Sequence, residues 1–211
     1  SEKEIGISDD NSGIMEISDN AENGTDLKEL YEIEDIIFEV DNKSLTNRPD
    51  LWGHYGIARE FAALAGRPLK PIDTADLSVY SSLPQLDIKI EDTACQRYSR
   101  LQVENISRTV SPVNMRIRLF YCGMRAINFL ADLTNYLMLE MGQPMHAFDS
   151  RRVEKIRIKK FDSPFDFQTL DGVERHIDEN TLMICNGSTP DAIAGIMGGL
   201  DSEIVDDTTR L

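Results

Sequence analysis

The chain contains 211 residues, of which 41% are hydrophobic, and its formal net charge is −15. This length allows one large or two small domains with a hydrophobic core, and no apolar run approaches the roughly 18 residues of a membrane span. The negative field repels phosphate backbones, which excludes a protein that grips nucleic acid over a wide surface and leaves only a small contact, or one supported by another chain.

The first 80 residues predict short extended pieces followed by a helix. The runs IMEI (14–17) and DIIFEV (35–40) indicate strands or strand-like pieces. Helical spacing of apolar residues, with proline in the first turn and glycine after the end, predicts a helix from about 49 to 65. The looser stretch PIDTADLSVYSSLP (71–84) is typical of a linker, so a domain boundary is predicted near residue 80.

Two further helices are predicted in the middle of the chain. In the first, Ser111 is expected to cap the helix, Pro112 to occupy its first position and Gly123 to close it. The second is expected to begin after Asn128 as its cap and to end before Gly142. Because only a few residues join them, the two helices should pack as a hairpin.

The remaining sequence is typical of strands and turns. An Asp171-Gly172 turn between extended runs predicts a β-hairpin. Strands and helices occur in blocks without a βαβ rhythm, so the predicted fold class is α+β, with largely antiparallel sheets preceded by a small helical and strand-containing part. Strands are predicted over 86–92, 97–106, 155–161 and 181–187.

His146, one of only three histidines, follows the second of these helices in the sequence GQPMHAFD. Pro144 stiffens the loop that carries it, and Asp149 is placed to orient its ring. A single histidine is more often structural than functional, so the residues alone favour a structural role. A metal site built from His146, Asp149 and a distant acid is an alternative for which the sequence offers no support.

Two other patterns admit both a structural and a functional interpretation. Thr134 and Asn135 are weak helix formers in the middle of a predicted helix. They either bond to the helix backbone and to water or face a pocket, and their spacing does not separate these possibilities. The stretch AIAGIMGGLDSE (192–203) is neither a Walker loop nor G-x-G-x-x-G. Its glycines either let a backbone N–H approach a ligand or make a bulge.

The cysteines are three in number and widely spaced, without a C-x-x-C pair. This pattern indicates neither a zinc knuckle nor a disulfide framework, and it is typical of idle thiols in a reducing cytoplasm. The chain also lacks an initiator Met, so we expect it to be a piece of a longer protein.

Several long motifs, in order along the chain, resemble the β subunit of bacterial phenylalanyl-tRNA synthetase over nearly all 211 residues. Ala126 is a small departure, since the family usually has proline there. The motifs are SEKEIGIS (1–8), LTNRPDLWGHYGIAREFAAL (45–64), INFLADLTNYLMLEMGQPMHAFD (127–149), TLDGVER (169–175) and AIAGIMGGLDSEIVDDTT (192–209).

The resemblance implies an architecture and a set of partners. Residues 1–78 would follow the tRNA-binding insertion of the family, and residues 84–211 would form its B3/B4 editing region. The family's enzyme is a cytoplasmic (αβ)₂ heterotetramer whose α subunit uses ATP and magnesium, so no cofactor is expected in this part. The implied partners are the α subunit and the 3′ end of tRNA(Phe), with no membrane.

The resemblance also implies an activity, the hydrolysis of mischarged Tyr-tRNA(Phe); the alternative is a non-catalytic scaffold of the synthetase. A glutamate that recognises the tyrosine hydroxyl is expected a few residues beyond Leu211, and Glu203 lies too early to match it. The implied site residues are, for catalysis, His146, Thr134 and Asn135 and, for substrate binding, Ala194, Gly195 and Gly198.

Overall fold

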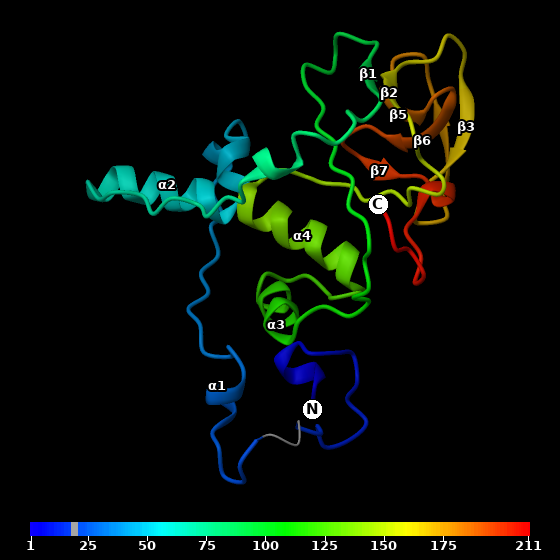
Figure 1. Cartoon of the computed structure of the whole chain (residues 1–211). Coiled ribbons are helices and arrows are strands. Elements are labelled where there is room, and N and C mark those ends of the chain that lie inside the picture. Colours follow the sequence, from blue (N-terminus) through cyan, green and yellow to red (C-terminus); the bar gives the residue numbers. More distant parts are fainter. Residues whose placement is uncertain (18–20) are drawn as a thin grey trace. The chain divides into compact units, whose positions relative to one another are not determined.

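A computed structural model describes residues 1–17 and 21–211, which form two compact units (Figure 1). The helical unit combines Ser1–Lys70 with Arg108–Met145, and the sheet unit combines Pro71–Ser107 with His146–Leu211. Each unit is thus made from two separate stretches of the chain. The predicted continuous division into 1–78 and 84–211 stays a prediction.

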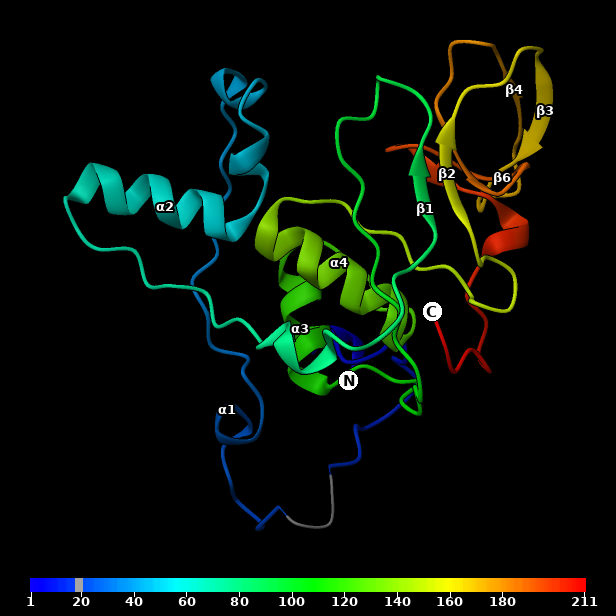
Figure 2. The same cartoon turned by 45° about the horizontal axis from the view of Figure 1, so that its top comes forward.

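The helical unit contains four α-helices and several short 3₁₀ turns within its described residues. Helix α3 packs against α4, as predicted for a hairpin, and α2 also packs against α4 (Figures 1 and 2). The helices are α1 (Leu27–Leu30), α2 (His54–Ala65), α3 (Val113–Tyr121) and α4 (Phe129–Met141), and the 3₁₀ turns are Lys3–Ile5, Lys43–Leu45 and Pro49–Trp52.

The strands expected over 14–17 and 35–40 are wrong. Both segments are described as irregular or extended chain without a strand assignment. Their apolar side chains are turned to solvent, with Ile14 98% and Ile36 88% exposed. A strand needs a neighbour to pair its backbone groups, and neither segment has a ladder partner among the described residues, so β-forming composition alone did not produce a strand.

The helix expected over 49–65 is divided at Gly53. A 3₁₀ turn, Pro49–Trp52, precedes Gly53, and α2 starts at His54. Gly53 is extended, and a Cβ on it would lie 2.2 Å from the backbone nitrogen of Gly142. The chain therefore changes direction where two backbones approach each other closely, a tertiary contact that the periodicity does not encode.

Three of the predicted helix ends are confirmed, but the predicted start of α3 is wrong, since Pro112 takes the cap position and the helix begins at Val113. The side chain of Asn128 accepts a hydrogen bond from Ala131 N–H at 2.9 Å, and Gly142 adopts φ 73° at the end of α4. Gly123 follows α3 as expected. Ser111 does not cap α3, because its hydroxyl is buried and donates instead to the carboxylate of Asp132.

The sheet unit is built on one five-stranded sheet in the order β1-β2-β5-β6-β7, with β3 and β4 forming a separate hairpin (Figures 1 and 2). β1 and β2 are parallel and the other pairs are antiparallel, so the α+β class with largely antiparallel sheets is confirmed. The strands are β1 (Ile88–Ile90), β2 (Ile156–Lys159), β3 (Phe165–Gln168), β4 (Glu174–Ile177), β5 (Met183–Asn186), β6 (Thr189–Ile193) and β7 (Met197–Gly198).

The five-stranded sheet is buried on both faces. Alternate side chains of β5 show this directly, since Ile184 joins one apolar cluster whereas Met183 and Cys185 join the other. The predicted turn at Asp171-Gly172 is confirmed by the β3–β4 hairpin. The strand predicted over 97–106 is not part of the sheet; there, Val103 exchanges two backbone hydrogen bonds with Leu211, at 2.8 and 2.9 Å.

Within the part of the chain that the structure describes, no helix has the length and apolar character needed to cross a membrane.

Candidate functional site

His146 lies at the start of the second stretch of the sheet unit. Its imidazole packs edge-on against the ring of Phe148, with centroids 4.4 Å apart and planes at 66°. Phe148 in turn packs against the apolar cluster that contains Val153 and Ala192. The described residues make no hydrogen bond to either ring nitrogen of His146, so packing rather than polar partners fixes the ring and leaves both nitrogens available.

Gly198 forms the surface on which the His146 ring rests. A Cβ at this position would lie 2.2 Å from the imidazole carbon Cε1 and 2.7 Å from Nε2. The same Cβ would also lie 2.8 Å from Cδ1 of Leu170. Any side chain here must displace one of these groups, so glycine is required by close approach to the ring.

The backbone around Gly198 is held on two sides. On one side Gly198 pairs with Ala192 of β6. On the other, its carbonyl accepts a hydrogen bond from Leu170 N–H at 2.9 Å. Because β6 holds one edge of this short strand and Leu170, in the turn after β3, holds the other, the surface beneath the imidazole is part of the sheet and not a free loop.

The predicted substrate-binding residues Ala194 and Gly195 form the turn between β6 and β7. Gly195 has φ 73°, and a Cβ on it would meet no atom of the described part of the chain within 4 Å. Ala194 N–H donates to the carbonyl of Leu182 at 2.9 Å, and Ile196 beside it is 74% exposed. The turn is thus anchored at one end and open to solvent at its tip, as a surface that receives a ligand must be.

Burial lowers the pKa of His146 from its ordinary value, since removing water disfavours the imidazolium. The residue as a whole remains exposed to solvent. At neutral pH the ring is therefore uncharged, with one nitrogen that donates and one that accepts. A neutral imidazole can hold a water molecule or a hydroxyl group.

Asp149 does not orient the imidazole, contrary to the expectation from its spacing. Its carboxylate is fully buried and accepts hydrogen bonds from the guanidinium of Arg151 and from the hydroxyl of Thr208. Arg151 holds the pKa of Asp149 well below its usual range. Arg151 also binds Asp207, at 2.8 Å, so this cluster fastens residues 207–208 to the loop that follows His146.

Thr134 and Asn135 lie in α4 of the helical unit, whereas the other predicted site residues lie in the sheet unit. The hydroxyl of Thr134 donates to the carbonyl of Ala131 at 2.8 Å, which is the structural alternative that the sequence left open. The structure thus brings His146 together with Gly198. The convergence of both with Thr134 and Asn135 stays a prediction.

In the described part of the chain, no three or more His, Cys, Asp or Glu side chains lie close enough together to hold a metal ion. Cys95, Cys122 and Cys185 are free thiols. Among the described residues, His146 and Asp149 therefore belong to no such group.

Asp191 is a further polar residue near this site, and the sequence analysis missed it. Ile184 of β5 pairs with Ala192, but Cys185 pairs with Pro190, so Asp191 is the extra residue of a β-bulge. Its side chain is 8% exposed, and Oδ2 has no hydrogen-bond partner among the described residues. Burial raises the pKa of Asp191 to about 6, and the charge of Asp201 adds to the rise.

Stability should therefore depend on pH through Asp191. The pKa in the fold lies above the ordinary value of 3.8, so protonation stabilises the fold below about pH 4 and this contribution is lost as the pH rises through about 6. We expect the native chain to lose about 2 kcal/mol of unfolding free energy between pH 4 and 7.5 relative to Asp191→Asn. Urea denaturation of both proteins over this range measures the difference, and parallel curves would contradict the prediction.

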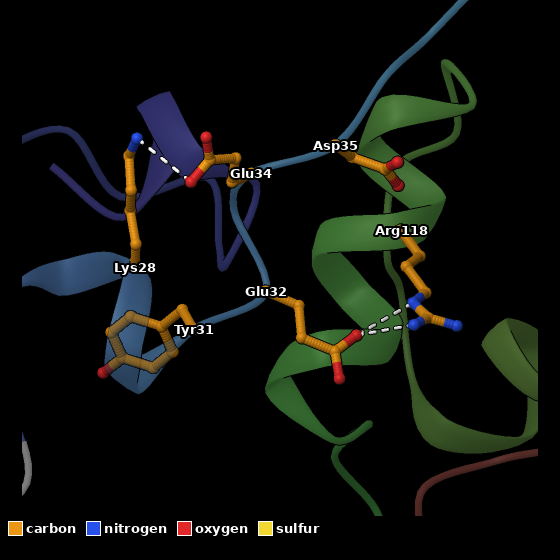
Figure 3. Close-up of a pocket in the computed structure, with 6 residues that line it drawn as sticks. All are labelled: Lys28, Tyr31, Glu32, Glu34, Asp35 and Arg118. Carbon is orange, nitrogen blue, oxygen red and sulfur yellow. Dashed lines mark hydrogen bonds and ion pairs between the residues drawn. The ribbon is translucent and has the colours of Figure 1, made fainter.

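The helical unit has a groove of its own, with a volume of about 320 Å³, that contains none of the predicted site residues. Figure 3 shows Glu34 turned toward Lys28 and Glu32 turned toward Arg118, with ion-pair distances of 3.2 and 2.6 Å. These charges satisfy one another on an exposed surface, where such pairs contribute little. The groove is lined by Lys28, Tyr31, Glu32, Glu34, Asp35 and Arg118.

The chain has an α+β fold, and its largely antiparallel sheet places Gly198 against the imidazole of His146. This fold is consistent with a B3/4 domain. The B3/4 domain family matches residues 94–211, which is more than half of the chain, and the chain belongs to this family. The match contains His146 and the whole glycine-rich stretch.

Particular relatives extend the similarity over the entire chain. This chain is 40% identical over 217 aligned residues to the phenylalanine–tRNA ligase beta subunit of Syntrophus aciditrophicus. The alignment covers 99% of this chain and 26% of the relative. The corresponding subunits of Clostridium tetani and Solibacter usitatus are also 40% identical, over 100% and 99% of this chain. The chain spans about a quarter of the length of the curated relatives it matches. The resemblance drawn from the sequence motifs is thereby confirmed.

Proposed function

We propose that this chain is the part of a phenylalanine–tRNA ligase β subunit that binds the aminoacylated 3′ end of tRNA(Phe) and hydrolyses mischarged Tyr-tRNA(Phe). The family and the relatives support the assignment to the ligase. The observation that carries the hydrolytic function is the close approach of the His146 ring to Gly198, together with two ring nitrogens that make no hydrogen bond to any described residue.

The proposed hydrolysis would correct errors that a binding pocket for phenylalanine cannot avoid by itself. A pocket shaped for phenylalanine rejects an analogue with one added hydroxyl by only about 100-fold. A second site that hydrogen-bonds the tyrosine hydroxyl can reject phenylalanine by about 10⁴-fold or more, because its buried polar groups would be left unpaired. Editing therefore requires polar groups around a cavity of aromatic size.

In this proposal the neutral imidazole of His146 holds the attacking water or meets the tyrosine hydroxyl. An aminoacyl ester is already reactive, so placing the water is worth more than a strong base. The backbone at Gly195 and Gly198 accepts the aminoacyl end. Thr134 and Asn135 supply further hydrogen-bonding groups. The Thr134 hydroxyl donates its proton to the carbonyl of Ala131, but its oxygen can still accept hydrogen bonds.

The proposal includes the partners of the complete enzyme. The α subunit holds the aminoacylation site with ATP and magnesium, and the assembled enzyme works in the cytoplasm. The net charge of −15 supports a division of labour in which only the 3′ end of the tRNA enters this part. The chain by itself is expected to bind tRNA weakly.

A deacylation assay tests the proposal. Substitution of His146 by alanine should lower hydrolysis of Tyr-tRNA(Phe) by at least about 100-fold, because the water loses its partner. The assay uses the 211-residue chain and, as a second arm, an intact ligase whose Clostridium tetani β subunit carries this chain in place of the matching stretch. His176→Ala is the matched control, since His176 is an exposed residue of β4 that binds Asp166.

The competing function is a non-catalytic scaffold. It is favoured by the hydrogen bond from the Thr134 hydroxyl to the carbonyl of Ala131, because this bond engages the hydroxyl within its own helix. If both arms of the assay show the same turnover for His146→Ala and the native chain, only the scaffold remains. A metal-dependent hydrolase would instead lose its activity in a chelator.

A further inference from the structure

Ser202 is buried close to the Gly198 surface on which the His146 ring rests. It ends the 3₁₀ turn Leu200–Ser202 and is 1% exposed. Its hydroxyl oxygen lies 2.9 Å from the carbonyl oxygen of Asp191 and 3.2 Å from that of Gly199. A hydroxyl has one proton, so it binds one carbonyl well and remains within reach of the other.

The carbonyl of Asp191 is available for this role because of the β-bulge. As the extra residue of β6, Asp191 has no partner residue in β5. Its carbonyl accepts a hydrogen bond from Gly199 N–H at 2.7 Å as well as the one from Ser202. The bulge thus joins β6 to both ends of the short segment 199–202.

Gly199 has no room for a side chain in this arrangement. A Cβ on it would lie 2.4 Å from Cζ of Phe167 and 2.6 Å from the carbonyl oxygen of Asp191. The two consecutive glycines therefore face different neighbours, with Gly199 against Phe167 and Gly198 against His146. A shift of one glycine must move the other, since one peptide group joins them.

We infer that Ser202 is a positioning residue that locks the Gly198–Gly199 backbone in place, and through it the imidazole of His146. The catalytic consequence rests on the proposed function, whereas the geometric consequence does not. Without the hydroxyl, segment 199–202 loses its second tie to β6. Gly198 then moves relative to the ring that rests on it.

The test compares Ser202→Ala and Ser202→Cys with the native chain. Cysteine keeps the size of the side chain but is a poor donor, so it separates the hydrogen bond from packing. Ser163→Ala is the control, because Ser163 is an exposed residue of the same unit. Nuclear Overhauser contacts between the His146 ring protons and the Gly198 α protons report the geometry, and kcat and KM for Tyr-tRNA(Phe) report the reaction.

Both Ser202 variants should weaken the ring-to-glycine contacts and lower kcat by about 10-fold while KM stays within about 2-fold, since the groups that bind the substrate remain and only their alignment is lost. The control should change neither readout. A folded Ser202 variant that keeps the native contacts and the native kcat overturns the inference, and the cysteine variant decides should the alanine variant fail to fold. If the native chain does not hydrolyse the ester, the proposed function fails, and the contacts alone decide the role of Ser202.

Discussion

Gly198→Ala is expected to lose most of the ester hydrolysis, by about 100-fold, although it adds only one methyl group. The new Cβ would lie 2.2 Å from Cε1 of His146, and on its far side it meets Cδ1 of Leu170 at 2.8 Å. The Gly198 backbone is held by β6 on one edge and by the hydrogen bond from Leu170 N–H on the other, so the methyl group must displace the imidazole or the Leu170 side chain. A displacement of about 1 Å is sufficient to spoil the alignment of a water with an ester.

The measurements are the deacylation rate and the unfolding free energy of the same preparation. Overpacking should also destabilise the fold by about 1–3 kcal/mol, so the control must separate stability from activity. Gly187→Ala provides this, because Gly187 has φ 62° and no atom within 4 Å of its missing Cβ. It should lose about 1 kcal/mol and keep its rate. A Gly198→Ala protein that hydrolyses at the native rate would remove the basis for the candidate site.

The features that the sequence predicted well depend on contacts between near neighbours. Asn128 caps α4 through an amide three residues away, and the turn at Asp171-Gly172 joins two adjacent strands. Ser111 was wrongly expected to cap its own helix. Its hydroxyl binds Asp132, 21 residues further along, and that buried carboxylate also accepts a hydrogen bond from Ile127 N–H at 2.7 Å. A distant charged partner outweighed a local one.

Distant contacts also explain why the candidate site could be predicted only through the resemblance. His146 and Gly198 are separated by 52 positions, and no spacing rule connects an imidazole to a glycine. The sequence allowed the glycines either a ligand contact or a bulge. In the structure the bulge is at Asp191, and Gly198 is small because a ring approaches it. Only pairing between β6, β7 and the residues near Leu170 creates that approach.

A large loss of stability is expected from Gly53→Ala in the helical unit. The added Cβ would lie 2.2 Å from the nitrogen and 2.7 Å from the α carbon of Gly142. These are backbone atoms, so no side chain can turn away, and the start of α2 must separate from the end of α4. His54 follows directly, and its Nδ1 would then lose its 2.8 Å hydrogen bond to the carbonyl of Leu139. We expect the unfolding free energy to fall by about 3 kcal/mol or more.

Urea denaturation of Gly53→Ala beside Gly13→Ala measures this effect. Gly13 has no atom of the described residues within 4 Å of its missing Cβ and no left-handed backbone, so its substitution should change the unfolding free energy by less than about 0.5 kcal/mol. The two variants make the same chemical change, and they differ only in what the methyl group meets. Equal stabilities would mean that α2 and α4 are not held together by the approach of Gly53 to Gly142. A loss confined to Gly53→Ala would show that two glycines set the distance between these helices.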